Sequence, residues 1–443
     1  MSPPKLPSPT QLSIPTTNQI PPISRNTFSD SITSTSLSIH EAINLAITRS
    51  PQLQADYKNL EAMLLDIPLV TSLEDPMLEV VTEEDFQGPG NERENMVVLR
   101  QTFPWFGKRR LMGLISGSAA AFAIEEYRLA VLETRRDVHT AWWNAVYSKE
   151  NAKLLREEQQ LLLSAEEATR SLYQSGESDQ SALIRLQTEQ AIISGMLQET
   201  LGAEQAARHE LARLLAMSIP ETELLGNLDA GSSISIPPLN DLVALAMEYR
   251  PELAGISEER KLASLQEQLA RKDYYPDFTV GAGAVGMGMK SSSYYEFDSD
   301  DRTDRWQASV GINIPLPNAR RKAAVRQARI RGEEAELRHG AVSDQILQQV
   351  AGTTSLITSL QQQSVLYSSS IIPLAEQAFH ATRVAYQSGN ATYSDLIDVQ
   401  RSLVSARREH LGIQRDLSIF TAELERSIGI PLNSTNLQED HSK

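Results

Sequence analysis

The stretch YQSGNATYSDLIDVQ, at residues 386–400, decides the fold because YQSGESDQSALIRLQ at residues 173–187 repeats its main features. Two further blocks recur in the same order: Pro51 with its flanking residues corresponds to Pro251, and Phe103-Pro104 corresponds to Ile314-Pro315. The three blocks are offset by 213, 200 and 211 positions, respectively. Repeated blocks in one order predict an internal duplication of a unit of about 200 residues, far longer than a solenoid repeat.

The duplication divides the chain into four segments. We expect a disordered Pro/Ser/Thr-rich N-terminal segment at 1–36, a first structural repeat at 37–235, a second at 236–435 and a flexible tail at 436–443. Each repeat is predicted to hold shorter helices, then a β-hairpin (77–103 and 277–314), then a long helical hairpin (108–215 and 318–428). The first helix should begin at Ser38, because Ser38 and Glu41 have the spacing of a capping box. The second helix of each repeat should end before Pro76 or Pro276.

The long helical hairpins are predicted to be coiled coils. No proline lies between Pro104 and Pro220, and the last helix has a seam that alternates in steps of three and four residues. That seam consists of Leu396, Val399, Leu403, Ala406, His410, Ile413, Leu417, Phe420 and Leu424. His410 is interpreted as a polar seam residue that fixes the register, with a metal or proton role as the alternative. Pro373 is expected to kink or break the third long segment.

Four short runs are predicted to be strands, at about 77–86, 96–103, 277–288 and 305–314. The last run places Trp306, Ala308, Val310, Ile312 and Ile314 on one face and polar or small residues on the other. This pattern fits either a transmembrane β-barrel or an amphipathic sheet on a soluble core. A bacterial barrel needs at least about eight strands and tolerates no open edge in lipid. If the strands span a membrane, three chains with twelve strands are therefore the simplest solution. The polar linkers near Gln87–Glu94 and Lys290–Asp304 would be the outward-facing loops.

Composition narrows the possible functions. The 443-residue chain has a formal net charge of −16, which argues against binding to nucleic acid. It has no cysteine, which excludes disulfides and thiolate metal sites, and its seven histidines are scattered. No stretch approaches the roughly 20 apolar residues of a membrane-spanning helix. Residues 1–36 lack the apolar core of a signal peptide, so we expect a misassigned start or a truncated N-terminus.

No motif in the sequence supports an enzyme or a cofactor site. Gly281-Ala-Gly283-Ala-Val-Gly286 matches GxGxxG, but dinucleotide binding needs a helix to start there. Ser291 to Tyr295 and the acidic Glu296 to Asp301 follow instead, which is not a helical pattern. We therefore expect no cofactor, no resident metal and no catalytic residues.

Two motifs carry a resemblance to a known family: Tyr386-x-x-Gly389-x5-Asp395-Leu396-x-Asp398 and the junction Phe103-Pro104-x-x-Gly107-Lys108-Arg109. Together with the duplication, four strands and long helices, they make the chain resemble the outer membrane factor (TolC-like) efflux family. Within that family it looks most similar to the outer membrane components of heavy-metal and multidrug RND tripartite pumps. The resemblance covers about residues 37–435.

The resemblance implies a mainly α fold with a small transmembrane β part. Three chains would form a homotrimer whose long coiled-coil helices make an α-barrel and whose strands make a 12-stranded β-barrel. Such a trimer lies in the outer membrane, extends across the periplasm and exports drugs or metal cations passively. Its implied partners are a periplasmic adaptor (membrane fusion protein), an inner-membrane RND-type pump and outer membrane lipid.

The resemblance also implies site residues at the ends of the helical hairpins. A periplasmic constriction falls on Asp395, Asp398 and Tyr386. Adaptor-contacting tips fall on Ser175, Gly176, Glu177, Ser388, Gly389 and Asn390. Ala182 and Arg185 stand at the aspartate positions in the first repeat, so an acidic ring could form only from the second hairpin. The family's best-studied member has an arginine in the tip network at the position of Ala391. The resemblance therefore leaves undecided whether salt bridges hold this constriction closed.

Each aspartate also has a simpler interpretation. Thr392 and Asp395 have the spacing of a capping box, and an acid in the first turn suits the helix dipole. Asp398 could lie on a solvated helix face. The alternative for the whole chain is a soluble periplasmic coiled-coil scaffold or adaptor of an efflux assembly, with no barrel.

Overall fold

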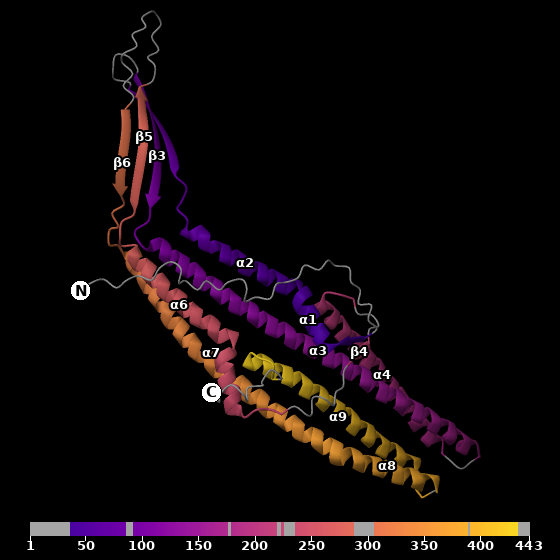
Figure 1. Cartoon of the computed structure of the whole chain (residues 1–443). Coiled ribbons are helices and arrows are strands. Elements are labelled where there is room, and N and C mark those ends of the chain that lie inside the picture. Colours follow the sequence, from indigo (N-terminus) through magenta and orange to yellow (C-terminus); the bar gives the residue numbers. More distant parts are fainter. Residues whose placement is uncertain are drawn as a thin grey trace, which may run out of the picture. The chain divides into compact units, whose positions relative to one another are not determined.

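A computed structural model describes residues 36–85, 92–175, 179–218, 223–225, 235–287, 305–388 and 390–432 (Figure 1). The chain packs into two compact units, and each draws on both halves of the sequence. The sheet unit contains residues 58–125 and 254–340, and the helical unit contains residues 36–57, 126–253 and 341–432. The predicted N-terminal segment, the tail and most of the two strand-connecting loops lie outside the described residues.

Helices dominate the described chain, and the elements of its two halves follow a similar order. Along the sequence they are β1 (Ser36–Ser38), α1 (Ile39–Arg49), α2 (Pro51–Thr71), β2 (Met77–Asp85), β3 (Glu92–Phe103), α3 (Lys108–Ser175), α4 (Gln180–Leu215), β4 (Glu223–Leu225), α5 (Leu239–Tyr249), α6 (Pro251–Lys272), β5 (Phe278–Met287), β6 (Arg305–Ile312), α7 (Ala319–Leu366), the π-helical turn η4 (Tyr367–Ile371), α8 (Ile372–Gln387) and α9 (Tyr393–Ile428). None of the described helices has an apolar stretch long enough to cross a membrane.

The local signals that begin and end the helices are confirmed. At the start of α1, the Ser38 hydroxyl accepts a hydrogen bond from the Glu41 amide at 3.3 Å, and the Ser38 amide donates to Glu41 Oε2 at 2.9 Å. This capping box satisfies two amides that a helix start leaves unpaired. Helices α2 and α6 end at Thr71 and Lys272, before the prolines that were expected to stop them.

Pro373 interrupts the third long segment as predicted. It lies at the beginning of α8, directly after the π-helical turn η4. There the Ile372 amide donates to the carbonyl oxygen of Tyr367, five residues back rather than four. Proline has no amide proton and its ring crowds the preceding turn, so the wider π turn accommodates it within a continuing helix.

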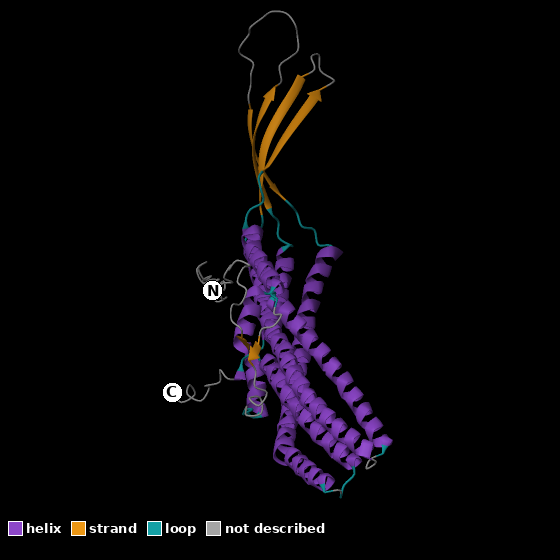
Figure 2. Ribbon diagram, turned by 90° about the vertical axis from the view of Figure 1, so that its right-hand side faces the viewer, coloured by secondary structure: helices purple, strands orange, loops and turns teal. Residues whose placement is uncertain are grey.

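The four predicted strands form one antiparallel sheet in the order β2-β3-β5-β6 (Figure 2). Strands β3 and β5 join the two halves of the chain in a register that pairs Phe103 with Phe278. Strand β3 begins at Glu92, four residues before the predicted start at 96. Its first residues are polar, so the hydrophobic pattern missed them, yet they pair with the end of β2. The loop predicted at Gln87–Glu94 is therefore shorter than expected.

The two faces of the sheet differ in polarity. Large apolar side chains share one face and are exposed: Leu78, Val80, Val97, Leu99, Phe103, Val280, Trp306, Val310 and Ile312. Trp306 is 87% exposed, which is unusual for the largest apolar side chain. The opposite face carries an ion pair between Arg100 and Glu79 and a 3.2 Å contact between the hydroxyls of Thr102 and Thr279. The alternation predicted for the last strand is confirmed in β6, and exposed apolar side chains of the other three strands share its apolar face.

Gly281 and Gly283 of the GxGxxG sequence lie in the polar face of the sheet. A Cβ atom on Gly281 would lie 2.6 Å from Ser309 Oγ, and one on Gly283 would lie 2.9 Å from Val98 Cγ2. Both distances are too short for real atoms, so these glycines allow close approach of neighbouring side chains. The dinucleotide motif is thus part of strand β5, which agrees with the interpretation made from the sequence.

The helical unit is held by buried apolar clusters. One surrounds Trp142 of α3, which is fully buried against α1 and against Leu211 of α4. A second packs Leu242 of α5 against α7 and Leu417 of α9. Burial of each leucine side chain stabilises the fold by about 1.5–3 kcal/mol. The seam predicted in the last helix is largely buried, and its polar member His410 lies 3.3 Å from the Ser364 hydroxyl.

Candidate functional site at the ends of the helical hairpins

The predicted site residues lie where α3 meets α4 and where α8 meets α9, both in the helical unit (Figure 1). Of the six tip residues, Ser175, Ser388 and Asn390 are described and exposed. Gly176, Glu177 and Gly389 lie outside the described residues. The two hairpin ends are close together, since Arg185 Nη1 of α4 donates to the Ser394 hydroxyl of α9 at 3.1 Å.

Asp395 caps helix α9. Its Oδ2 accepts hydrogen bonds from the Thr392 hydroxyl at 2.6 Å and the Thr392 amide at 2.9 Å, and its own amide donates to the Thr392 hydroxyl. The Thr392 hydroxyl, followed by its amide, lowers the pKa of Asp395 below its ordinary value. The capping interpretation is confirmed. The carboxylate is also held in its charged form, as a ring of charges would require.

Asp398 lies one turn further along α9 and its side chain is 67% exposed. Its Oδ1 lies 3.7 Å from Arg401 Nη1 on the same helix. An exposed ion pair of this length contributes roughly 0–1 kcal/mol and is screened by salt. Asp398 therefore remains accessible to ions in solution.

Tyr386 packs against a second tyrosine across the α8–α9 turn. Its ring makes an edge-on contact with Tyr393, with the ring centres 5.8 Å apart. The Tyr393 hydroxyl is buried and has no hydrogen-bond partner among the described residues. Burial, followed by the nearby Tyr386 and Glu189, raises the pKa of Tyr393 well above its ordinary value. Tyr386 thus contacts the first turn of α9 through Tyr393, and it bonds to neither predicted constriction aspartate among the described contacts.

The structure adds an ion pair that sequence reasoning missed. Arg401 of α9 binds both carboxylate oxygens of Glu189 in α4, with Nε 2.8 Å from Oε1 and Nη2 bonded to Oε2. Glu189 is only 4% exposed, so the pair is shielded on one side from water. Two parallel bonds of this kind fix geometry as well as charge. They link the two helical hairpins. Arg401 thus supplies, at this end of the unit, a positive charge that Ala391 does not supply.

A groove of about 670 Å³ lies beside this ion pair. It is bordered by α3, α4, the turn η4 and α9, and its lining includes Glu158, Glu189, Arg401, Arg408 and Met196. Arg408 is held by Asn151 Oδ1 at 3.0 Å and contacts the Met196 sulfur at 3.4 Å. No group of histidines and acids in the described chain is arranged to hold a metal ion.

Glu158 is the most perturbed acid of this groove. It is 3% exposed, and its Oε2 has no hydrogen-bond partner among the described residues. Burial, followed by repulsion from Glu189, raises the pKa of Glu158 to about 7, against the opposing effect of Arg408 and Arg401. Its carboxyl group therefore changes charge near neutral pH. Sequence alone gave no sign of this, because Glu158 sits among other acids on a long helix.

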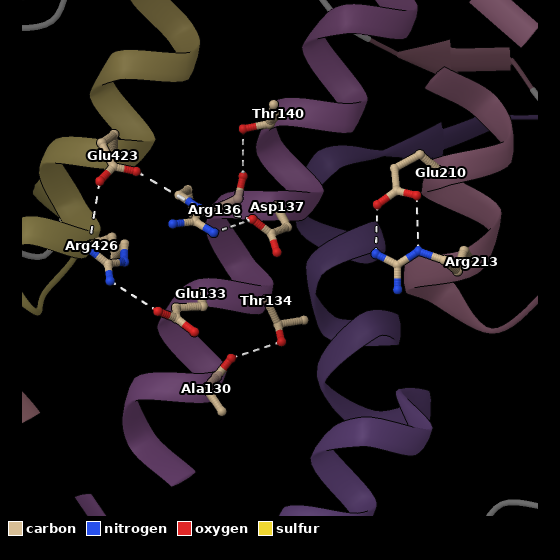
Figure 3. Close-up of polar contacts among 10 residues, drawn as sticks. All are labelled: Ala130, Glu133, Thr134, Arg136, Asp137, Thr140, Glu210, Arg213, Glu423 and Arg426. Carbon is tan, nitrogen blue, oxygen red and sulfur yellow. Dashed lines mark hydrogen bonds and ion pairs between the residues drawn. The ribbon is translucent and has the colours of Figure 1, made fainter. Parts of the chain in front are cut away.

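A second charged network, further along the same helices, connects α3 to α9 (Figure 3). Arg426 bonds to Glu133 at 3.0 Å and lies 3.7 Å from Glu423, while Arg136 lies 3.8 Å from the same Glu423. Arg136 also bonds to Asp137 at 2.6 Å. Every charge in this network faces an opposite one, so we interpret it as structural.

Comparison with known proteins finds similarity to outer membrane efflux proteins. Residues 242–430 match the family model described as outer membrane efflux protein. The cobalt-zinc-cadmium resistance protein CzcC of Cupriavidus metallidurans is 24% identical over 402 residues, which cover 89% of this chain and 90% of CzcC. The cation efflux system protein CusC of Escherichia coli is 25% identical over 210 residues, which cover 46% of this chain and 44% of CusC.

Solved structures have the same fold along nearly the whole chain. A crystal structure of CusC superimposes with a TM-score of 0.76 at 16% identity and covers 92% of this chain and 96% of its own. The outer membrane protein VceC of Vibrio cholerae gives a TM-score of 0.72 at 19% identity, covering 88% of this chain and 96% of its own. The predicted fold class, long helices with a small β part, is confirmed.

The titration of Glu158 predicts a pH-dependent stability. Its folded pKa of about 7 lies above its ordinary value of 4.5, so the folded state holds the proton more tightly than the unfolded chain. The resulting stabilisation is complete below the ordinary value and is lost as the pH rises through about 7. We expect the melting temperature to fall from about pH 5 to about pH 8 by a few degrees more in the unsubstituted protein than in Glu158→Gln, at about 2–4 °C per kcal/mol.

Thermal unfolding of the purified protein, followed by circular dichroism, measures this difference. The matched control is Glu157→Gln, which removes an exposed acid from the same helix. It should keep the pH dependence of the unsubstituted protein. Equal pH dependence in Glu158→Gln and the unsubstituted protein would contradict the assignment.

Proposed function

We propose that this chain, a member of the outer membrane efflux protein family, is the exit duct of a tripartite efflux system in the outer membrane. In this role it lets substrates pass from the periplasm to the exterior without supplying energy itself. Ducts of this family are channels rather than enzymes. The observation that carries the proposal is the sheet with one exposed apolar face, built onto two long helical hairpins.

The unpaired sheet edges support a homotrimer. Strands β2 and β6 are the edges of the sheet, and neither pairs on its outer side with any described residue. Unpaired backbone groups in lipid cost several kcal/mol each, so the edges need partners. Three copies supply twelve strands, which exceeds the minimum of about eight for a closed barrel. Exposed apolar side chains along α7, such as Leu337 and Leu356, would also be buried against neighbouring copies in such an assembly.

The cargo is a metal cation or a drug, and the relatives favour a cation. CzcC is named for cobalt, zinc and cadmium resistance, and CusC for cation efflux. The formal net charge of −16 suits a positively charged cargo. The energy would come from an inner-membrane RND-type pump, and a periplasmic adaptor would join that pump to the tips of the helical hairpins.

The constriction is proposed to consist of Asp395 and Asp398, with Tyr386 beside them. In three copies, the two aspartates place six carboxylates around one axis, and such rings select cations. The low pKa and capping bonds of Asp395 keep its charge in place, and the exposure of Asp398 leaves its charge accessible. The adaptor-contacting tips are proposed at Ser175, Gly176, Glu177, Ser388, Gly389 and Asn390.

The alternative function is a soluble periplasmic scaffold or adaptor without a barrel. An apolar face with Trp306 at 87% exposure argues against it, because soluble proteins rarely leave such a face open. We expect the protein to fractionate with outer membranes and to be extracted only by detergent. Analytical ultracentrifugation should then give about three times the chain mass of 49.1 kDa. A protein that stays in the aqueous fraction as a monomer would contradict the duct.

Removal of the two aspartate charges should weaken cation selectivity. We choose Asp395→Asn with Asp398→Asn, since the amide oxygen of asparagine can still accept the hydrogen bond from the Thr392 amide in the capping box. In planar bilayers the ratio of cation to anion permeability should fall severalfold, on the order expected for loss of a charged ring. Glu199→Gln, an exposed acid further along α4, is the control and should not change the ratio. Unchanged selectivity in the double variant would remove these aspartates from the constriction.

Changes at the exposed tips should abolish export without affecting assembly. Asn390→Trp adds a bulky side chain, and Ser388→Arg adds a charge, at positions that bury nothing in this chain. We expect the cells to lose resistance to the exported substrate, while the amount of trimer in the membrane stays constant. Glu199→Trp, away from the tips, tests whether bulk alone is harmful. Normal export in both tip variants would place the adaptor contact elsewhere.

A further inference from the structure

Basic residues gather at the starts of α3 and α7, the helices that follow strands β3 and β6 (Figure 1). Helix α3 begins with Lys108, Arg109 and Arg110 and has no acid before Glu125. Helix α7 has no acid before Glu333, and its preceding basic residues are Arg320, Arg321, Lys322, Arg326, Arg329 and Arg331. Cations at a helix N-terminus are opposed by the helix dipole. Their concentration there, in a chain with a net charge of −16, requires a separate cause.

Four of these basic side chains have partners inside the chain, and one of them, Arg329, pairs with Glu333 at 3.2 Å within α7. Lys108 is buried and bonds to Asp277 at 3.0 Å, with Asp273 at 3.5 Å. Arg109 Nε donates to the Thr71 carbonyl at 2.7 Å. Arg321 donates to the carbonyls of Asp273 and Leu316. These bonds position the helix starts below the sheet.

Arg110, Arg320 and Lys322 lie in the first turn of α3 or α7, are exposed, and make no ion pair or hydrogen bond through their side chains with any described residue. We call these three the basic collar. Internal structure does not account for their charge, and no acid stands beside them in either helix. A partner outside the chain that carries negative charge would account for it.

An aromatic cluster in the same unit lies between the apolar face of the sheet and the helix starts. Trp105 stacks between Tyr275 and Phe278, with ring centres 5.3 and 5.4 Å apart. Phe278 is opposite Phe103 and Ile312 in the apolar face, so the cluster continues that face. Phe106 is 77% exposed, and the carbonyl of Phe106 accepts a hydrogen bond from Lys272.

The order of these features matches half of a lipid bilayer. An apolar surface comes first, then tryptophan and tyrosine, then exposed cations. Tryptophan and tyrosine favour the boundary between hydrocarbon and headgroups. Arginine and lysine just beyond that boundary attract anionic headgroups by about 1 kcal/mol each. Guanidinium groups in particular can bond to two phosphate oxygens at once.

We propose that the basic collar binds the headgroup phosphates of anionic phospholipids in the leaflet that faces the helices. The aromatic cluster sets how deeply the sheet lies in the membrane. Arg110, Arg320 and Lys322 bind the lipid headgroups beside the starts of α3 and α7. This inference rests on the proposed function, which places the sheet in a membrane. It adds a lipid-binding surface with a defined headgroup chemistry.

The test compares lipid binding by the full-length protein in uncharged detergent. Native mass spectrometry counts bound phosphatidylglycerol and phosphatidylcholine on the unsubstituted protein and on the variant Arg110→Gln, Arg320→Gln, Lys322→Gln. We expect the preference for phosphatidylglycerol to fall on the order of tenfold in the variant. The variant Arg110→Lys, Arg320→Lys keeps the positive charges and should keep most of the preference for phosphatidylglycerol. A control with Lys153→Gln, Arg156→Gln and Arg383→Gln removes three exposed cations from the helical unit. This control should keep the preference for phosphatidylglycerol.

Two results would overturn the proposal: an unsubstituted protein that binds both lipids equally, or a collar variant that keeps its preference for phosphatidylglycerol. Conductance measured in bilayers of phosphatidylcholine alone distinguishes failure of the lipid-binding proposal from failure of the proposed channel function. A collar variant that conducts normally there is folded and inserted, so its lipid preference can be interpreted. If the unsubstituted protein forms no channel in any bilayer, the proposed function itself fails.

Discussion

The unpaired backbone groups at the two edges of the four-stranded sheet are the constraint on which the remaining structure depends. Strands β2 and β6 expose their hydrogen-bonding edges, while the face between them exposes large apolar side chains such as Trp306 and Val310. In water the apolar face is unfavourable, and in lipid the open edges are unfavourable. Both costs would disappear in the proposed trimer, where copies of the sheet join edge to edge within a membrane. That proposed assembly would depend on backbone hydrogen bonding rather than on a specific side-chain contact.

Hydrogen bonds at the junction between the sheet and the helices hold the strand ends and the start of α3 together. Asp277 accepts hydrogen bonds from the Trp105 amide and from the Lys108 ammonium group, and its own amide bonds to Asn313. Through its carboxylate and its backbone amide, Asp277 therefore ties the end of β3, the start of α3 and the segment after β6 to the start of β5. Burial raises the pKa of Asp277, but these hydrogen bonds outweigh it and the net effect is a lower pKa. The charged form that holds the junction is consequently the stable one.

At the hairpin ends, stability and the proposed selectivity use the same charged groups. Asp395 caps α9 and is held ionised by Thr392, so its structural role and its role in an acidic ring reinforce each other. Arg401 neutralises the buried Glu189 while lying near Asp398. Any change in the Arg401–Glu189 pair would alter both the connection between hairpins and the charge near the constriction. Glu158, with its pKa of about 7, makes this region sensitive to pH near neutrality.

The sequence alone determined the features that depend on neighbouring residues: the Ser38 and Thr392 capping boxes, the seam of α9, the break at Pro373 and the alternation in β6. Such features follow from periodicity and local hydrogen bonding, which a single stretch of chain contains. The tertiary structure decided which side chains meet across 212 positions, as Arg401 and Glu189 do, and which acid loses its water, as Glu158 does. It also decided that the side chains of Arg110, Arg320 and Lys322 have no partner among the described residues. Burial and ion pairing depend on the packing of distant helices, and no local pattern of residues specifies that packing.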